Sequence, residues 1–502
     1  MRALYVSSEV YPLAKTGGLA DVSAALPTAL SKLGVEMSVL VPGYHGTIRS
    51  AAAKSILFES TDFLGFGPVR LIAAQTPDSG LPIWIVDSPT LFRRAGGLYQ
   101  DEQGRDWSDN AFRFALFNHI AAQLSLGELV ANWRADVVHA NDWHAGMTPA
   151  LLASVQGRRP GTLFTIHNAA YQGVFPGYLY EGLRLPANAF NSDGVEFYGG
   201  VSFLKAGIRY SDLLTTVSPT YAAELLTPEY GCGLDGLLRA RQRKLYGILN
   251  GVDYHVWNPG RDSYLPECFD PGNLAGKRTC KTELQRELLL EPRSDMPLMV
   301  YVSRLTDQKM ADVVLEAIPE IVERGAQLAM LGQGEPSIEQ RFLEVAQKYP
   351  GRLAARIGYD EALAHRFHAG ADILLHPSRF EPCGLTQLYA MRYGTLPVVT
   401  RVGGLTDTVV DASDQTLRLG TATGFVFQYP NAQAMLACVD RALALYDQPL
   451  AWRKVQYQAM SRDFGWDVSA QRYLALYNKL VPDGVQIDVT MDADPLLKTA
   501  VR

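Results

Sequence analysis

Short, continuously apolar runs alternate with helix-like patterns through most of the sequence, in two separate series. The first series comprises residues 2–7, 37–41, 82–86, 136–140 and 162–166, and the second comprises residues 298–303, 327–331, 353–357, 372–376 and 396–400. Helical patterns separate several of these runs, at residues 20–33, 110–126, 310–323 and 336–347. Continuous rather than alternating apolar strands between helices are typical of parallel sheets covered on both faces. The two series predict an α/β fold with two Rossmann-like, doubly wound domains.

The composition changes between the two series. Residues 250–273 are rich in Gly, Pro, Asn and Asp and have no long periodic pattern, which indicates a linker. A helix over about 275–289 is expected to follow the linker. The expected domains are residues 1–250, joined by a helix at about 465–480, and residues 251–464, with 481–502 as a loose or surface-wrapping tail.

Charge and cysteine content exclude several classes of protein. The 502 residues include 46 Lys+Arg and 52 Asp+Glu, a net charge of −6, which argues against a general nucleic-acid binder. Five scattered cysteines without a C-x-x-C pair make a poor disulfide framework and a poor zinc site, so a reducing cytoplasm is the expected setting. The N-terminus enters a strand pattern at once, unlike a signal peptide, and no run reaches the ~18 apolar residues of a membrane span.

Polar motifs follow the strands of the first series. Ligands of open parallel sheets bind beyond the carboxyl ends of the strands, so the default site is a cleft between the two domains. Lys15 and a Gly-Gly pair precede a helix whose free N–H groups and positive dipole end favour an anion. Asp142 follows a later strand, and His167 and Asn168 follow the next. A solvated Lys15 in an ordinary turn and a purely structural His167 stay open as alternatives here.

The second series carries a basic loop and an isolated carboxylate. Arg304 and Lys309 follow its first strand, and two cations ahead of a helix match the charge of a diphosphate. Glu381 directly precedes another helix start, where N–H groups from Gly384 to Thr386 suit phosphate oxygens. Cys383 is expected to be a packing thiol. A solvated basic turn and a surface Glu381 are the competing interpretations.

Other common motifs are incomplete or absent. The G-x-G at Gly332 and Gly334 has Ser337 at the third glycine position, which makes a nicotinamide-dependent dehydrogenase remote. The sequence has no G-x-S-x-G nucleophile elbow, no H-E-x-x-H motif and no cysteine cluster, so we expect no metal site.

Nine segments, in order from the first strand to about Tyr477, closely resemble the bacterial glycogen synthase family, which uses ADP-glucose and includes the plant starch synthases. They are SSEVYPLAKTGGLADV (7–22), HANDWHAG (139–146), FTIHNAAYQG (164–173), SFLKAG (202–207), TVSPTYA (216–222), GILNGVD (247–253), VSRLTDQK (302–309), PSRFEPCGLTQLYAMRYGT (377–395) and VGGLTDTV (402–409). The resemblance implies a GT-B glycosyltransferase fold and retaining transfer of glucose from ADP-glucose to the non-reducing 4-hydroxyl of an α-1,4-glucan. It implies no metal or other cofactor.

The resemblance also implies roles for individual residues. Glu381 would bind the glucosyl group, His167 would lie near the anomeric carbon, and Arg304 and Lys309 would hold the diphosphate. Lys15 would be the ADP-glucose-binding lysine. The further implied binding residues are Gly18, Asp142, Asn168, Gly384, Leu385, Thr386, Glu9, Asp21, Tyr99 and Tyr359. The N-terminal domain would serve the acceptor and the C-terminal domain the nucleotide sugar.

Two positions depart from the family pattern. Met310 stands where the family usually has Gly, and Asn141 stands where it commonly has His. We expect neither side chain to contact a residue assigned to chemistry. A UDP-glucose transferase, a nucleotide-sugar epimerase and a weakly active glucan-binding paralogue stay open as alternatives. The expected partners are ADP-glucose and a glucan primer, with no nucleic acid or membrane, and no oligomeric state is predicted.

Overall fold

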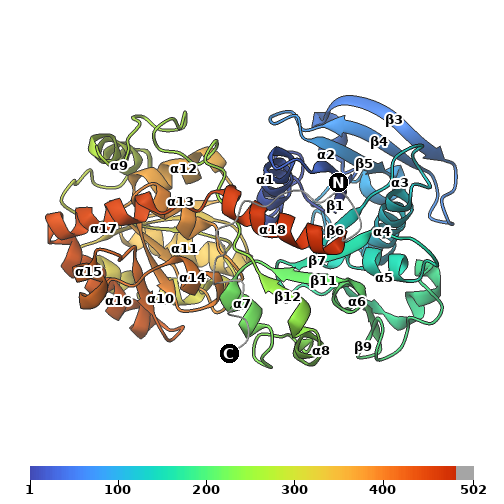
Figure 1. Cartoon of the computed structure of the whole chain (residues 1–502). Coiled ribbons are helices and arrows are strands. Elements are labelled where there is room, and N and C mark those ends of the chain that lie inside the picture. Colours follow the sequence, from blue (N-terminus) through green and yellow to red (C-terminus); the bar gives the residue numbers. More distant parts are fainter. Residues whose placement is uncertain (482–502) are drawn as a thin grey trace. The chain divides into compact units, whose positions relative to one another are not determined.

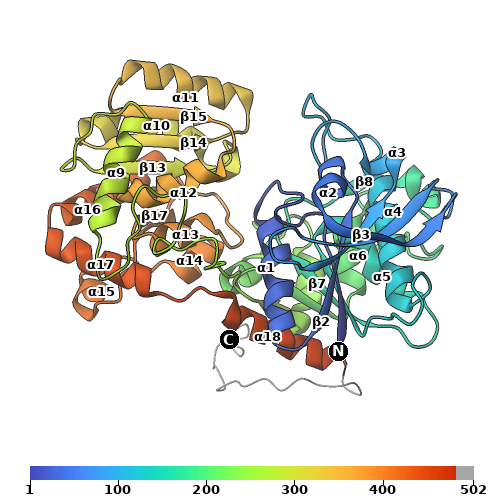
Figure 2. The same cartoon turned by 90° about the horizontal axis from the view of Figure 1, so that it is seen from above.

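The computed structural model describes residues 1–481 and divides the chain into two compact units (Figures 1 and 2). The first unit contains Met1–Gly251 and helix α18 (Trp466–Leu480), and the second is Val252–Gly465. The tail expected at residues 481–502 lies outside the described residues apart from Val481. None of the described helices is both long and apolar enough to cross a membrane.

The first unit is built on a nine-stranded sheet of order β12-β11-β7-β6-β1-β2-β5-β4-β3. Its strands are β1 (Arg2–Val6), β2 (Glu36–Pro42), β3 (Ala52–Ser60), β4 (Val69–Gln75), β5 (Pro82–Asp87), β6 (Val137–Asn141), β7 (Gly161–Ile166), β11 (Leu213–Thr216) and β12 (Leu245–Gly247). All neighbouring strands are parallel except the pairs β3–β4 and β4–β5. The apolar side chains of β1 are fully buried because helices cover both faces of the sheet.

Helices flank this sheet on both faces (Figure 2). They are α1 (Gly18–Lys32), α2 (His45–Ser50), α3 (Pro89–Phe92), α4 (Asn110–Leu126), α5 (Met147–Ala153), α6 (Phe203–Tyr210), α7 (Pro219–Glu224) and α8 (Asp235–Ala240), with 3₁₀ turns at Trp143–Ala145, Gly177–Leu183 and Gln242–Lys244. Helix α18 returns to this unit, where Tyr473 and Tyr477 share a buried cluster with Leu26 of α1 and Tyr5 of β1. A small antiparallel sheet joins β8 (Val174–Pro176), β10 (Gly200–Ser202) and β9 (Glu196–Phe197).

The second unit has a six-stranded, fully parallel sheet of order β15-β14-β13-β16-β17-β18. Its strands are β13 (Leu298–Val302), β14 (Gln327–Gly332), β15 (Leu353–Ile357), β16 (Ile373–His376), β17 (Leu396–Thr400) and β18 (Phe425–Phe427). Its helices are α9 (Ala275–Glu287), α10 (Ala311–Glu323), α11 (Pro336–Lys348), α12 (Glu361–Gly370), α13 (Thr386–Arg392), α14 (Gly403–Thr408), α15 (Asp414–Leu419), α16 (Ala432–Tyr446) and α17 (Pro449–Ser461), with a 3₁₀ turn at Asp307–Lys309. Two buried clusters, one on each face, fill the space between sheet and helices.

Both predicted strand series are confirmed, and with them the doubly wound character of each unit. The pattern did not predict the antiparallel β3–β4 hairpin at the sheet edge (Figure 1). Strand β3 has no buried residue, so it lacks the continuous apolar run that marks a buried parallel strand. The predicted site residues lie beyond the carboxyl ends of the buried strands, at the edge where parallel sheets bind ligands.

Candidate functional site

In the first unit, Glu9 anchors the loop that carries Lys15. The buried Glu9 carboxylate accepts the backbone N–H groups of Thr16 at 2.7 Å and Gly17 at 3.3 Å. It also accepts the Tyr99 hydroxyl at 2.7 Å, and the burial of that hydroxyl and the nearby Glu9 charge raise the pKa of Tyr99 well above its usual value. Glu9 and Tyr99 were both predicted as binding residues. In the structure, Glu9 holds the loop through the backbone of that loop, and Tyr99 holds the Glu9 carboxylate.

Lys15 lies beside the start of α1. Its Nζ is 2.8 Å from Oδ1 of Asp21, in the first turn of the helix, and 5.0 Å from the centroid of the Tyr11 ring. Gly18 is the exposed first residue of the helix, where backbone N–H groups have no intrahelical partner. The structure thus brings Lys15, Gly18 and Asp21 together at a helix N-terminus that favours negative charge.

Asp142 links the ends of β6 and β7. Its Oδ1 accepts the backbone N–H of His167 at 2.7 Å and that of Asn168 at 3.4 Å. Asp142 has φ +53°, a strained value for a residue other than glycine. Burial raises the pKa of Asp142 to about 7, although the two backbone hydrogen bonds favour its charged form. The carboxylate therefore holds His167 and Asn168 in place through their main chain.

The His167 ring is neutral and contacts Asn141. Burial lowers the pKa of His167 to about 3. Its Nε2 lies 3.0 Å from Oδ1 of Asn141, the last residue of β6. The expectation that Asn141 contacts no residue assigned to chemistry is therefore wrong. The reason is the strand register, because β6 and β7 are neighbouring parallel strands and both residues stand at the same edge of the sheet.

In the second unit, Glu381 is the centre of a buried cluster. Its Oε2 forms an ion pair with Lys309, accepts a hydrogen bond from Ser378 at 3.1 Å and lies 3.4 Å from Nε2 of His376. Burial alone would raise the pKa of Glu381, but Lys309 and His376 outweigh burial and hold that pKa below its usual range. The surface interpretation of Glu381 is excluded, since its exposed fraction is 6%.

His376 and Ser378 were missed by the sequence analysis. His376 is the last residue of β16 and is buried, and burial lowers the pKa of its ring. The available signal was its position, because His376 ends a strand just before the motif that contains Glu381. Nothing in the spacing distinguished it from a core histidine.

The loop after Glu381 is fixed by Gln387, another residue that the sequence analysis did not single out. The Gln387 amide donates to the carbonyls of Cys383 at 3.1 Å and Gly384 at 2.9 Å. Gly384 has φ +72°, and a Cβ there would lie 2.3 Å from Oε1 of Gln387, so the turn requires glycine. Leu385 then precedes Thr386, the first residue of α13. Cys383 is buried, as expected for a packing thiol.

Two other predicted residues are exposed on loops of this unit. Arg304 follows β13 by two residues, and Tyr359 precedes α12, where its hydroxyl donates to Glu361. Met310, which follows Lys309, is fully buried and has φ +53° at the start of α10. Its left-handed backbone explains why a glycine suits this position.

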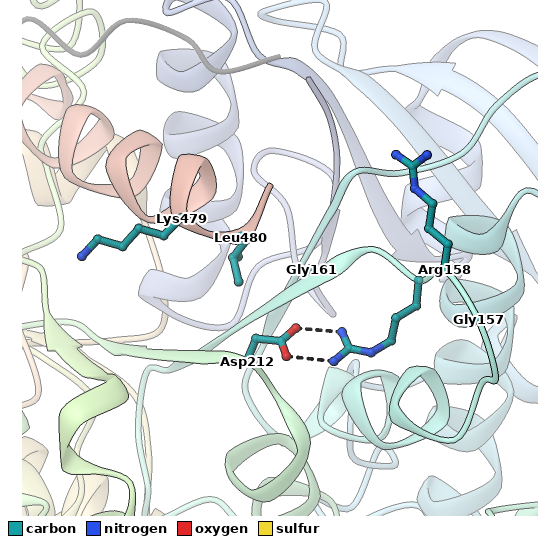
Figure 3. A pocket seen from close by; sticks show the side chains of 7 residues that line it. Gly157, Arg158, Gly161, Asp212, Lys479 and Leu480 are labelled. Carbon is teal, nitrogen blue, oxygen red and sulfur yellow. Dashed lines mark hydrogen bonds and ion pairs between the residues drawn. The ribbon is translucent and has the colours of Figure 1, made fainter. Parts of the chain in front are cut away.

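A cavity of about 500 Å³ in the first unit lies away from these residues (Figure 3). It is lined by Gly157, Arg158, Arg159, Gly161, Asp212, Lys479 and Leu480. Arg159 forms two hydrogen bonds with Asp212, at 2.7 and 2.8 Å. Gly161 begins β7, whereas His167 follows the end of that strand, so the cavity lies at the opposite edge of the sheet from the candidate site. Within residues 1–481, no three His, Cys, Asp or Glu side chains are grouped so as to hold a metal ion.

Family models match both units. Residues 2–240 match the starch synthase catalytic domain, and residues 289–459 match glycosyl transferases group 1. A solved structure, the catalytic domain of starch synthase IV from Arabidopsis thaliana bound to ADP and acarbose, matches with a TM-score of 0.87 and 32% identity, over 96% of this chain and 99% of that chain. The predicted GT-B fold class is thereby confirmed.

Curated relatives match nearly the whole chain. The glycogen synthase of Paramagnetospirillum magneticum is 51% identical over 96% of this chain and 98% of its own length. The glycogen synthase of Burkholderia thailandensis is 51% identical over 95% of this chain and 90% of its own length. The glycogen synthase of Francisella tularensis subsp. novicida is 46% identical over 96% of this chain and 99% of its own length. The chain belongs to the glycogen synthase family of glycosyltransferases.

Proposed function

We propose that this chain transfers glucose, with retention of anomeric configuration, from ADP-glucose to the non-reducing 4-hydroxyl of an α-1,4-glucan. The family supports glycosyl transfer, and the related starch synthase IV was solved with ADP and acarbose. The observation that carries the proposal is the ion pair of buried Glu381 with partly buried Lys309, beyond the carboxyl ends of β16 and β13. It combines a cation for a phosphate with a carboxylate for sugar hydroxyls at the edge where such sheets bind ligands.

The charges suit the departure of a nucleoside diphosphate. The leaving group gains negative charge as the glycosidic bond breaks, and fixed cations stabilise that charge most when water is excluded. Lys309 and Arg304 are the cations proposed to hold the two phosphoryl groups, and the backbone N–H groups of Gly384 to Thr386 are proposed to bind phosphoryl oxygens as well. Lys15, at the start of α1, is proposed to bind the same donor. We propose that these groups suffice without a metal or other cofactor.

Glu381 has an electrostatic rather than a proton-donating role in this proposal. Lys309 keeps its carboxylate ionised, so it has no proton to give to a leaving group. The carboxylate can instead accept hydroxyl hydrogen bonds of the glucosyl group and stabilise positive charge at the anomeric carbon. The proton of the acceptor hydroxyl is assigned to the departing phosphate, in a front-face displacement that retains configuration. Two-carboxylate hydrolysis would need a second acid at glycosidase spacing, which the proposal does not use.

Neutral His167 is proposed to bind the sugar by hydrogen bonding. With its pKa at about 3, the His167 ring is uncharged at neutral pH. It therefore adds no positive charge to that of the lysine and arginine side chains proposed to bind the phosphoryl groups. Asp142 and Asn168 are proposed to support the same sugar pocket, Asp142 through the main chain of His167.

The test is nucleotide release from ADP-glucose and from UDP-glucose, each with and without a maltodextrin primer. We expect ADP release that depends on the primer and a much lower rate with UDP-glucose. A higher rate with UDP-glucose would contradict the assigned donor. Tight glycogen binding without nucleotide release would identify a glucan-binding paralogue instead.

A further inference from the structure

Asn141 is buried at the end of β6 and is held by three hydrogen-bond contacts. Its Nδ2 donates to the carbonyl oxygen of Val6 at 3.1 Å and to that of His139 at 3.3 Å. Its Oδ1 lies 3.0 Å from Nε2 of His167. The exposed fraction of Asn141 is 0%, so water does not replace any of these contacts.

The two carbonyl contacts fix which way the Asn141 amide faces. Only the NH₂ group of an amide can donate, and a carbonyl oxygen only accepts. Turning the amide over would place Oδ1 against two carbonyl oxygens and leave buried groups without partners, which costs free energy. Oδ1 must therefore face the His167 ring.

An oxygen acceptor opposite a ring nitrogen requires that nitrogen to carry the proton. A neutral imidazole carries one proton, on either Nδ1 or Nε2. If Nε2 donates to Asn141, Nδ1 is left with a lone pair. Within the described part of the chain, Nδ1 of His167 has no hydrogen-bond partner, and the His167 side chain is partly exposed. Nδ1 is therefore open to a donor from a ligand.

We propose that Asn141 is a positioning residue that fixes His167 as the Nε2–H tautomer, so that Nδ1 accepts a hydrogen bond from a hydroxyl of the bound sugar. The nature of the ligand rests on the proposed function, whereas the tautomer does not. An amide is suited to this task because it fixes the proton without adding charge. Asp142 holds the main chain of His167, and Asn141 holds its ring.

The experiment uses the full chain labelled with ¹⁵N-histidine, and its His167 ring signals are assigned by comparison with His167→Ala. Long-range ¹H–¹⁵N correlation spectra distinguish protonated from unprotonated ring nitrogens. We expect a protonated Nε2 and an unprotonated Nδ1 for His167 in the wild type. A wild-type spectrum with the proton on Nδ1 would overturn the proposal, whatever the activity of the protein.

Two variants then test the consequence. Asn141→Leu removes the acceptor, so we expect a mixture of tautomers and a kcat lower by roughly 10-fold, in line with the loss of one orienting hydrogen bond of about 1.5 kcal/mol. Asn141→Asp keeps an acceptor opposite Nε2, and in its protonated form it also keeps a donor for the carbonyls of Val6 and His139. We therefore expect Asn141→Asp, measured at a pH low enough to protonate the introduced carboxyl group, to retain the Nε2–H signal and more activity than Asn141→Leu. An Asn141→Leu protein with wild-type tautomer and kcat would contradict the proposal. If Asn141→Leu does not fold, the spectra of the wild type and Asn141→Asp decide.

The outcome separates this inference from the proposed function. A wild type that shows the Nε2–H tautomer but releases no ADP from ADP-glucose would refute the donor assignment and leave the tautomer assignment standing. A wild type that turns over ADP-glucose with His167 protonated on Nδ1 would refute the tautomer assignment and leave the donor assignment standing.

Discussion

Asp142 in the first unit and Glu381 in the second are both buried carboxyl groups beyond the end of a parallel strand, but burial and nearby charge shift their pKa values in opposite directions. Glu381 pairs with Lys309, and its pKa is held below the usual range. Within residues 1–481, the carboxyl group of Asp142 accepts hydrogen bonds from backbone N–H groups alone, and burial raises its pKa to about 7. For Glu381, Lys309 and His376 outweigh the effect of burial. For Asp142, burial outweighs the two backbone hydrogen bonds, which by themselves favour the charged form. Glu381 is thus suited to stabilising positive charge on a ligand, and Asp142 is suited to holding the loop that carries His167.

The largest expected effect is that of Glu381→Ala. Its removal leaves the Lys309 charge without its carboxylate partner and takes away the group proposed to face the anomeric carbon. We expect kcat to fall by about 100-fold to 1,000-fold, as for loss of one preorganised electrostatic group. The measurement is primer-dependent ADP release, with circular dichroism to show that the fold is retained. Glu316→Ala, on the exposed side of α10, is the control and should behave as the wild type.

Lys15→Ala should have a smaller effect than Glu381→Ala. The Lys15 and Asp21 side chains are 19% and 26% exposed, against 13% and 7% for Lys309 and Glu381, so the first pair is easier to open. We expect kcat/KM for the donor to fall by about 10-fold to 100-fold, equivalent to the ~1.5–3 kcal/mol of a hydrogen bond to a charged group. Lys32→Ala, in the last turn of the same helix, is the matched control. Near-wild-type turnover in both Lys15→Ala and Glu381→Ala would overturn the site assignment.

Asp142→Asn tests the other carboxylate through pH. A folded-state pKa raised above the unfolded value gives stability that is present at low pH and is lost as pH rises toward the folded-state pKa. The wild type should therefore lose roughly 2 kcal/mol relative to Asp142→Asn between about pH 5 and pH 8. Asn keeps an oxygen acceptor for the His167 N–H but does not ionise.

The measurement is urea unfolding of both proteins at several pH values, followed by a probe in the first unit such as Trp143 fluorescence. Asp78→Asn, on an exposed turn, is the control for general charge effects. If the wild type and Asp142→Asn have the same pH dependence, Asp142 is ionised in the folded protein and the contrast with Glu381 fails.

The smallest effect concerns the loop that carries Lys309. Met310 has φ +53° and is fully buried, so both Met310→Ala and Met310→Gly lose its packing. Glycine adopts a left-handed backbone without strain, so we expect Met310→Gly to be more stable than Met310→Ala by about 1 kcal/mol. Inside a helix the order of stability is the opposite, because alanine is favoured there over glycine. Thermal unfolding of the two variants measures it, and a more stable Met310→Ala would show that the left-handed turn is not strained.

The sequence predicted the parts of the fold that depend on continuous apolar runs. Ten predicted strands follow from local periodicity, namely β1, β2, β5, β6 and β7 in the first unit and β13 to β17 in the second, and so do the helices α4 and α11. The edge hairpin β3–β4 does not, because β3 is exposed and its pairing with β4 is a non-local contact. Short strands such as β12 are held by neighbours rather than by their own pattern.

For the candidate site, the sequence located residues but not all of their contacts. Lys309 and Glu381 are far apart in the chain, and the resemblance to a family placed them in one site, where the structure shows an ion pair. The roles of Asn141 and His376 depend on which side chains meet at the edge of a sheet. That depends on strand order and register, which local patterns leave open.

The central claim is that this chain moves glucose from ADP-glucose onto a glucan with Glu381 as its buried, charged carboxylate. Incubation of ADP-glucose carrying a ¹³C-labelled glucosyl group with maltodextrin, followed by NMR, tests it most directly in the wild type and Glu381→Ala. The account predicts one new α-1,4-linked glucose for each ADP released by the wild type, and a rate at least about 100-fold lower in the variant. Release of free labelled glucose in place of the linkage, or equal rates in the two proteins, would contradict it.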